Sequence, residues 1–207
     1  MALPALLARS SAAALIALSS LVTLDAAPRG AGDSAASAGV VQRAPIRIDN
    51  FGRIGDTYYR GAQPEGRDYA DLAALGVKTV INLTSDDALA EEPGLVEKAG
   101  MKYEAIPMTT RVAPTPAQID RFLKIVNDPA SQPVYVHCVG GKHRTGVMTA
   151  VYRMNQDSWT ADKAFNEMKK YNFGMTMLHP EFKDFVYSYK APAPAAKLPS
   201  LLAIQTQ

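Results

Sequence analysis

The sequence predicts an α/β fold in which a central, mostly parallel sheet is flanked by helices. Short runs of β-branched and other apolar residues alternate with segments of helical spacing, several of which end at glycine. Residues 77–83 and 134–136 are almost continuously apolar, which is typical of strands buried on both faces of a parallel sheet. The second run leads into a glycine-rich loop and a helix-compatible segment, which together are the elements of an anion-binding site.

The first part of the folded region is expected to contain strands on either side of one helix. Alternating residues predict short strands at 46–48 and 51–60 around a turn. A helix that begins near residue 64 or 65 should continue to the stop at Gly76. The apolar run at 77–83 then forms a buried strand, and the polar loop after it should face the ligand-binding edge of the sheet.

The middle of the chain predicts one further helix and strand before a well-capped helix. Residues 91–99 have helical spacing, and residues 101–106 form another short strand. Thr115 followed by Pro116 and Gln118 is the pattern of an N-cap, a first-turn proline and a capping-box glutamine. The helix that starts there should run to about residue 127.

Three helices are expected after the glycine-rich loop. Residues 147–154 form the first, and its N-terminus should point at a bound anion. Thr160 is placed to cap the second, which ends near residue 171 with its apolar side chains on one face. Residues 181–189 form the last.

The two ends of the chain have compositions unlike that of the predicted domain at 45–190. Residues 1–27 resemble a secretory signal peptide with a short apolar stretch, and residues 28–44 form an Ala-, Gly- and Ser-rich linker that is expected to be disordered. Residues 191–207 are Pro- and Ala-rich and predict a loose tail. Export to the periplasm or the exterior is therefore expected; an uncleaved N-terminal segment would instead act as a membrane anchor.

Charge and cysteine content limit the possible classes of function. The net charge of +2 is too small to indicate a nucleic-acid partner, and no basic run is interleaved with aromatic residues. The single cysteine excludes an intramolecular disulfide, and no cysteine–histidine metal cluster is evident. We therefore expect neither a metal nor another cofactor.

The residues of the loop point to nucleophilic attack on phosphorus. Cys138 enters an amide-rich nest at a helix N-terminus, where a thiolate is favoured and can serve as the nucleophile. Arg144 has the planar fork that grips two phosphoryl oxygens. Gly140 and Gly141 allow positive φ and leave room for the anion, and the Thr145 hydroxyl could assist departure of the sulfur.

The other loop residues extend the predicted phosphate site. Val139 would contribute to the nest of loop amides, and Lys142 and His143 would make its rim basic. His137 could fix the loop by hydrogen bonding to backbone carbonyls. A lone buried cysteine is often only a small hydrophobe, but the register of arginine, glycine and threonine makes that interpretation weak here. A nucleotide-binding loop needs a hydroxyl residue directly after the lysine, where this chain has His143.

The loop sequence resembles the signature of the cysteine-dependent protein tyrosine and dual-specificity phosphatases. The matching pattern is His137-Cys138-x-x-Gly141-x-x-Arg144-Thr145-Gly146. Its Gly-Lys-His-Arg-Thr-Gly form is most similar to the atypical dual-specificity phosphatases of plants and fungi, several of which act on inositol pyrophosphates, and to bacterial relatives. The resemblance implies a phosphatase-type fold, with phosphate held by residues 139–144. A rhodanese also has a cysteine loop, but Arg144-Thr145-Gly146 fits phosphatases better.

The general acid expected from this resemblance is missing from its usual region. Residues 107–114 contain no aspartate or glutamate, and the first acid downstream is Asp120, in the early part of a predicted helix. Asp120 is therefore a candidate for the acid or simply a favourable partner of the helix dipole. Asp86 and Asp87 could lie near the site, but a solvated turn or helix cap is the favoured role for both. Arg60 could contact substrate, but a structural hydrogen bond is the favoured role, and Arg111 is a candidate substrate contact.

Three functions remain open from the sequence. The first is hydrolysis of phosphoprotein esters through a phosphocysteine, with Cys138, Arg144 and Thr145 as the catalytic residues. The second is hydrolysis of inositol polyphosphates or pyrophosphates, which the basic Lys142 and His143 favour. The third, suggested by the missing acid, is a catalytically weak phosphate-binding module. A phosphoanhydride would suffer least from that loss, because its leaving group is already acidic.

Overall fold

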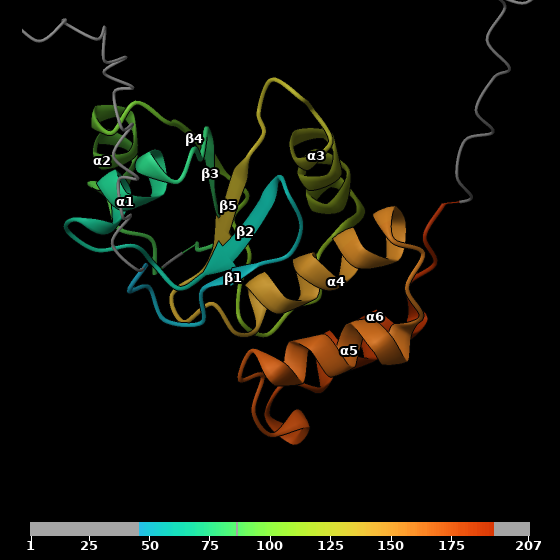
Figure 1. The fold of residues 1–207 in the computed structure, drawn as a ribbon. Coiled ribbons are helices and arrows are strands. Elements are labelled where there is room, and N and C mark those ends of the chain that lie inside the picture. Colours follow the sequence, from blue (N-terminus) through green and yellow to red (C-terminus); the bar gives the residue numbers. More distant parts are fainter. Residues whose placement is uncertain (1–45, 86, 193–207) are drawn as a thin grey trace, which may run out of the picture. The chain divides into compact units, whose positions relative to one another are not determined.

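A five-stranded sheet forms the centre of the computed structural model, which describes residues 46–85 and 87–192 (Figure 1). The strands lie in the order β1-β2-β5-β3-β4, and every neighbouring pair is parallel except β1 and β2. The strand bounds are β1 Gly52–Arg53, β2 Tyr58–Gly61, β3 Thr79–Asn82, β4 Lys102–Ala105 and β5 Val134–His137. The predicted α/β class with a mostly parallel sheet is confirmed.

Helices cover both faces of this sheet. The helices α1 and α2 lie on one side, and the helices α3 to α6 lie on the other (Figure 1). Their bounds are α1 Asp68–Ala74, α2 Glu92–Lys98, α3 Pro116–Val126, α4 Arg144–Gln156, α5 Ala161–Lys170 and α6 Pro180–Ser188. A 3-10 turn, η1, covers Thr176–Leu178.

Strand alternation divides the apolar side chains between two cores. In the central strand β5, Val134 and Val136 point to the core under α3 to α6, whereas Tyr135 points to the core under α1 and α2. The strand β2 follows the same rule, because Tyr58 belongs to the first core and Tyr59 to the second. Burial of both faces explains why β5 has a continuously apolar sequence.

The register of the parallel strands brings three strand ends together. Gly61 of β2 and Asn82 of β3 both lie beside His137 of β5. The loops that leave these strands therefore start from one edge of the sheet, where crevices of open α/β sheets bind ligands. The glycine-rich loop begins at this edge with Cys138.

Most predicted helices form close to their expected bounds. Thr115 caps α3 in a complete capping box, and the Thr160 hydroxyl accepts a hydrogen bond from the Lys163 amide at the start of α5. The helix α4 begins at Arg144, three residues before the predicted start at Val147, because the tight loop already turns into helix there.

Other expectations are wrong or lie outside the described part of the chain. The strand predicted at 46–48 does not form: Ile48 is buried by side-chain packing in the core of α1 and α2 instead of joining a ladder. The predicted signal peptide (1–27) and linker (28–44), like the tail beyond residue 192, fall outside the described residues. Within the described residues, no helix is both long and apolar enough to cross a membrane.

Candidate active site

Cys138 lies directly after β5 at the wall of a cavity of about 260 Å³. Cys138 is only 3% exposed and forms part of the lining of this cavity. The cavity is lined by residues from three loops and the start of α4: Asp87, Thr110, Cys138, Val139, Gly140, Lys142, His143 and Arg144. The structure thus brings together the predicted nucleophile, the predicted guanidinium and every predicted phosphate-binding residue except Gly141.

Three successive carbonyl groups of the glycine-rich loop accept hydrogen bonds from residues around β2. The pairs are Gln63 N to Val139 O at 3.0 Å, Asn50 Nδ2 to Gly140 O at 2.7 Å, and Arg60 Nη2 to Gly141 O. None of the amides of residues 139–145 donates a hydrogen bond to any part of the chain that the structure describes. The carbonyls are therefore tied to the scaffold while the amides stay free for an anion, as a nest requires.

Gly141 explains why the loop can rest on the end of β2. Its φ of 63° lies in the left-handed region, and a Cβ at this position would collide with the backbone of Gly61. The positive φ predicted for Gly141 is confirmed, but the missing side chain does not make room for phosphate as expected. Gly141 makes room for the scaffold, and it is not among the residues that line the cavity.

Arg144 is held at the first position of α4 by an acid from another loop. Its Nη1 and Nη2 donate to the two carboxylate oxygens of Asp87 at 2.8 and 2.6 Å, and Nη1 also donates to Met108 O at 3.1 Å. Burial alone lowers the pKa of the Arg144 guanidinium, but its hydrogen bonds to Asp87 and the nearby charges of Cys138 and Asp87 raise it overall. The guanidinium therefore stays charged and oriented beside the sulfur.

Asp87 is the carboxylate that lines the cavity, so its place near the site, the less favoured of the two alternatives, is the one that the structure shows. The hydrogen bonds from Arg144 hold the pKa of Asp87 below its ordinary value despite partial burial. Asp87 is consequently ionised at neutral pH, which suits a partner that orients Arg144 and does not suit a proton donor. The neighbouring Asp86 lies outside the described residues.

Asp120 and Arg111 do not lie at this cavity. Asp120 is exposed on α3, and Arg111 is exposed in the loop before that helix. Neither residue is among those that line the cavity. The helical position of Asp120 explains the difference, since α3 packs its apolar stripe on the sheet and turns this polar position to solvent. Thr110 is the residue of the 107–114 loop that lines the cavity.

The Thr145 hydroxyl is buried but does not donate to the cysteine sulfur as expected. Its Oγ1 has no hydrogen-bond partner among the described residues. A buried hydroxyl without a partner costs roughly 1–3 kcal/mol.

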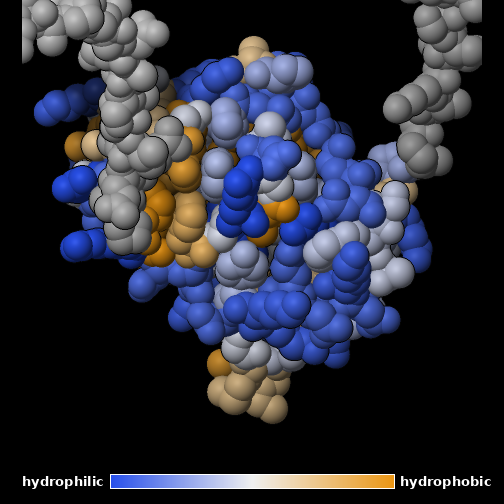
Figure 2. Space-filling model, viewed as in Figure 1, coloured by the Kyte–Doolittle hydropathy of each residue, from blue (hydrophilic) through white to orange (hydrophobic). Residues whose placement is uncertain are grey.

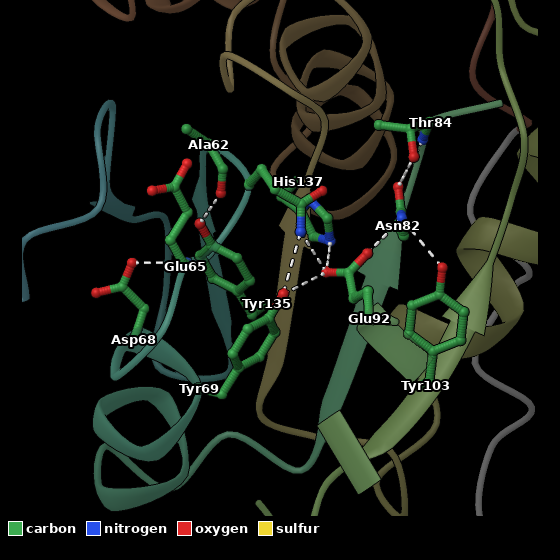
Figure 3. Close-up of polar contacts among 11 residues, drawn as sticks. Ala62, Glu65, Asp68, Tyr69, Asn82, Thr84, Glu92, Tyr103, Tyr135 and His137 are labelled. Atoms are coloured by element: carbon green, nitrogen blue, oxygen red, sulfur yellow. Dashed lines mark hydrogen bonds and ion pairs between the residues drawn. The ribbon is translucent and has the colours of Figure 1, made fainter. Parts of the chain in front are cut away.

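His137 belongs to a buried polar network beneath the loop (Figure 3). Its Nε2 lies 3.0 Å from Oε1 of Glu92, and both side chains are fully buried. The same carboxylate accepts hydrogen bonds from Gln63 at 2.7 Å and Asn82 at 2.5 Å. The expectation that His137 bonds to backbone carbonyls is wrong, because strand alternation turns its ring away from the loop and toward the α1–α2 side.

The rim of the cavity is joined to an exposed apolar turn. His143 Nε2 lies 2.9 Å from Phe173 O, and its ring lies 3.8 Å from the ring of His179. Between these two partners, η1 and the residue before it expose Met175, Met177 and Leu178. Figure 2 shows this turn as a hydrophobic projection at the lower edge of the face. Lys142 is exposed at the rim, as predicted.

Glu92 organises the site but was not identified as such from the sequence. Glu92 looked like one of several acids at the start of a helix, and nothing nearby in the chain marks it as buried. Arg60 was expected to make a structural hydrogen bond, which its contact with Gly141 confirms. Among residues 46–85 and 87–192, no group of three or more His, Cys, Asp or Glu side chains is arranged to hold a metal ion.

A family model described as "DSP-PTPase phosphatase fused to NAD+ Kinase" matches residues 52–183. Among curated proteins, the chain is 27% identical over 139 residues to the inositol diphosphatase SIW14 of Saccharomyces cerevisiae, covering 65% of this chain and 49% of the relative. It is 29% identical to the dual specificity protein phosphatase TpbA of Pseudomonas aeruginosa, covering 60% and 56%. The chain thus spans about half of the length of these relatives.

Two solved structures have the same fold over most of their length. The core catalytic domain of the S. cerevisiae SIW14 phosphatase, in complex with citrate, superposes with a TM-score of 0.62 at 25% identity, covering 71% of this chain and 89% of that one. The P. aeruginosa TpbA structure in complex with pTyr gives a TM-score of 0.59 at 27% identity, covering 71% and 88%. In both cases the described fold corresponds to a phosphatase domain.

Proposed function

The chain belongs to the DSP-PTPase phosphatase family, and on that premise we propose that it hydrolyses phosphate esters through a phosphocysteine intermediate. The observation that carries the proposal is the meeting of Cys138, Arg144 and a set of free loop amides at one small cavity. Each group has a place in phosphoryl transfer: a nucleophile, a bidentate cation and a nest for the phosphoryl oxygens.

The reaction has two displacement steps at phosphorus. The Cys138 thiolate attacks phosphorus, the S–P bond forms, and the bond from phosphorus to the leaving oxygen breaks. Arg144 and the loop amides hold the non-bridging oxygens as negative charge shifts onto them. Water then attacks phosphorus, inorganic phosphate is released and the thiolate is restored. We assign assistance of this second departure to the Thr145 hydroxyl, which has no other hydrogen-bond partner among the described residues.

Leaving groups of low basicity should react best in this site. Asp87 is ionised against Arg144, and Asp120 is exposed on α3, so neither is a ready proton donor at the cavity. Protonation of the leaving oxygen typically contributes 10²–10⁴-fold to a rate. Phenolic and phosphate leaving groups need this help less than aliphatic alkoxides do.

A second cavity favours phosphoprotein substrates. It has a volume of about 560 Å³, shares Asp87 and Val139 with the phosphate cavity, and offers space for the part of a substrate beyond the phosphoryl group. Its lining contains Asp49, Glu65 and Asp68 against the single cation Arg47. This balance favours a peptide with basic residues near its phosphotyrosine and disfavours a ligand that carries many phosphates.

Inositol polyphosphates and pyrophosphates are the second candidate substrates. The basic side chain of Lys142 lines the phosphate cavity and would attract a highly charged ligand. Relatives named as inositol diphosphatases are 27–28% identical to this chain. A phosphoanhydride also supplies a leaving group that does not depend on an enzyme acid.

Turnover of an aryl phosphate by wild type and Cys138→Ser tests the proposed chemistry. Wild type should release the phenol with a stoichiometric burst when the second step is slow, and the variant should release none. Vanadate should still protect the variant from thermal unfolding, because the amides and Arg144 remain. Equal rates in the two proteins would show that Cys138 is not the nucleophile. Vanadate binding without any turnover by wild type would indicate that the protein is a phosphate-binding module and not an enzyme.

A substrate panel separates the two substrate classes. We expect phosphotyrosine peptides with flanking lysine or arginine to have a higher kcat/KM than the same peptides with flanking glutamate, because of the acidic cavity. Asp68→Asn should reduce that preference. Faster hydrolysis of inositol pyrophosphates than of every peptide would instead assign the second class.

A further inference from the structure

Arg60 is a buried cation that forms no ion pair with the described residues. Its side chain is 0% exposed, and its Nε and Nη1 have no hydrogen-bond partner among the described residues. Two other charged side chains buried near the loop are paired, Glu92 with His137 and Arg144 with Asp87. An isolated charge in the protein interior is strongly unfavourable, so an anion is expected close to Arg60.

The strand register places Arg60 on the same face as Cys138. Arg60 of β2 lies beside Val136 of β5, and side chains two residues apart on a strand share a face. Cys138 is two residues beyond Val136, and both belong to the core under α3 to α6. The cysteine is therefore a diagonal neighbour of Arg60, within reach of a long side chain.

The guanidinium of Arg60 is fixed between the loop and α5. Its Nη2 donates to Gly141 O, and its Cζ lies 4.1 Å from the ring centroid of Tyr171. The Tyr171 ring occupies the space beside Gly52, where any side chain would collide with it. This packing leaves two nitrogens of the fork without protein acceptors, close to the base of the loop that holds the sulfur.

We propose that Arg60 is a positioning residue whose buried positive charge stabilises the Cys138 thiolate from beneath the loop, while its bond to Gly141 holds the loop in shape. The inference rests on the proposed function, since it concerns activation of the same nucleophile. Arg144 binds the phosphoryl group from the cavity side, and Arg60 acts on the sulfur from the side of the sheet.

Cys138 is one of the groups that interact electrostatically with Arg60. Burial lowers the pKa of Arg60, and interactions with Tyr58, Tyr171, Cys138 and Glu167 act in the opposite direction. Other charged or titratable groups line the cavity of the sulfur: Asp87, Lys142, His143 and Arg144. An experiment on Arg60 must therefore keep all of these in place.

Alkylation of Cys138 by iodoacetamide, measured against pH, tests the proposal without requiring turnover. Cys138 is the single cysteine of the chain, so incorporation reports on this site alone. Arg60→Gln keeps a hydrogen-bond donor for Gly141 and removes the charge. Its alkylation midpoint should rise by about one pH unit or more, with a roughly tenfold slower reaction below the midpoint. Arg60→Lys, which retains the charge, should stay closer to wild type than the glutamine variant.

Controls separate this proposal from a purely structural role. Arg53→Gln changes an exposed arginine of the neighbouring strand and should leave the midpoint unchanged. An unchanged midpoint in folded Arg60→Gln, or equal shifts in Arg60→Gln and Arg60→Lys, overturns the electrostatic role. If Arg60→Gln does not fold, Arg60→Met takes its place, and failure of both to fold makes the role structural. A wild-type thiol that is inert at neutral pH would instead contradict the proposed function itself.

Discussion

At the residue scale, Arg144 binds Asp87 and is proposed to bind the phosphoryl group of the substrate. Its Nη1 and Nη2 both donate to Asp87, and Arg144 and Asp87 both line the cavity proposed for the phosphoryl group. Asp87 thus fixes the plane of the guanidinium before substrate arrives. A preorganised donor of this kind needs little reorganisation during the reaction, which is where most of its catalytic effect comes from.

Replacement of Arg144 by lysine should be severe. A lysine supplies a point charge but not two parallel donors, and it cannot keep both the Asp87 pair and the phosphoryl contact. We expect kcat/KM for an aryl phosphate to fall by roughly 100-fold or more. Arg153→Lys, on the same helix but paired with Glu167 and Asp157, is the matched control and should be nearly normal. Near-normal turnover in Arg144→Lys would count against its assignment.

His143 should make stability depend on pH below neutrality. Burial, and then the charge of His179, lower the pKa of His143 from its ordinary value of 6.5. Above pH 6.5 the ring is neutral in both the folded and the unfolded state, so the protonation of His143 does not lower the free energy of unfolding. As the pH falls from 6.5 toward the lowered value, the unfolded chain binds the proton first, so the free energy of unfolding decreases.

The variant His143→Gln measures this contribution. Urea denaturation of wild type and variant at pH 7.5 and 5.5 should show a smaller loss of stability in the variant on acidification, because it has no ring to protonate. Parallel losses in the two proteins would show that other groups cause the acid dependence.

At the scale of elements, α3 supports the fold without contributing to the site. Its buried residues Ile119 and Phe122 pack on the sheet, and none of its residues lines the phosphate cavity. Thr115 fixes its start, with the Gln118 amide donating to Thr115 Oγ1 and the Thr115 amide donating to Gln118 Oε1. A substitution in this helix should therefore change the stability of the protein without changing its activity.

Thr115→Ala should lower the free energy of unfolding by about 1 kcal/mol, the usual cost of losing an N-cap side chain. Turnover of an aryl phosphate should be unchanged under conditions where the protein is folded. Lys124→Ala, an exposed substitution on the same helix, is the control for a change without a cap. A loss of turnover in the folded Thr115→Ala protein would show that α3 is coupled to the site.

At the scale of the whole molecule, the two faces of the sheet support the loop in different ways. The α1–α2 face supplies a polar network centred on Glu92 under His137, and the opposite face supplies Arg60 within an apolar core. The loop residues 138–143 lie between these two supports, and residues 50–63 tie their carbonyls in place. Segments that are far apart in the sequence must therefore all be in place to form the phosphate site.

Residues 45–192 should be sufficient for catalysis. All residues of the candidate site lie within the described part of the chain, so a shortened protein that begins at Pro45 is expected to keep the kcat/KM of the full chain. The comparison should use the same aryl phosphate and an equal concentration of folded protein. A large loss of activity on removal of residues 1–44 would show that this segment contributes to the site.

We further propose that residues 1–27 direct export, on the basis of their composition. Full-length protein produced in a bacterial host should appear in the periplasmic or extracellular fraction with a shorter N-terminus, and protein lacking residues 1–27 should stay in the cytosol. Membrane-bound, full-length protein in the first experiment would indicate an uncleaved anchor, and cytosolic full-length protein would exclude export.

The sequence by itself determined most of the helices and strands along the chain, the caps at Thr115 and Thr160, and the cysteine loop. Each of these depends on residues that are close together in the chain, so a local pattern is enough to predict them. The tertiary structure decided which distant residues complete the site. Asp87 lies 57 positions from Arg144 and Arg60 lies 81 positions from Gly141, and strand register alone brings each pair together. The tertiary structure also decided that His137 lies against Glu92. Side chains alternate between the two faces of a strand, so the pairing of the strand sets the face to which His137 points.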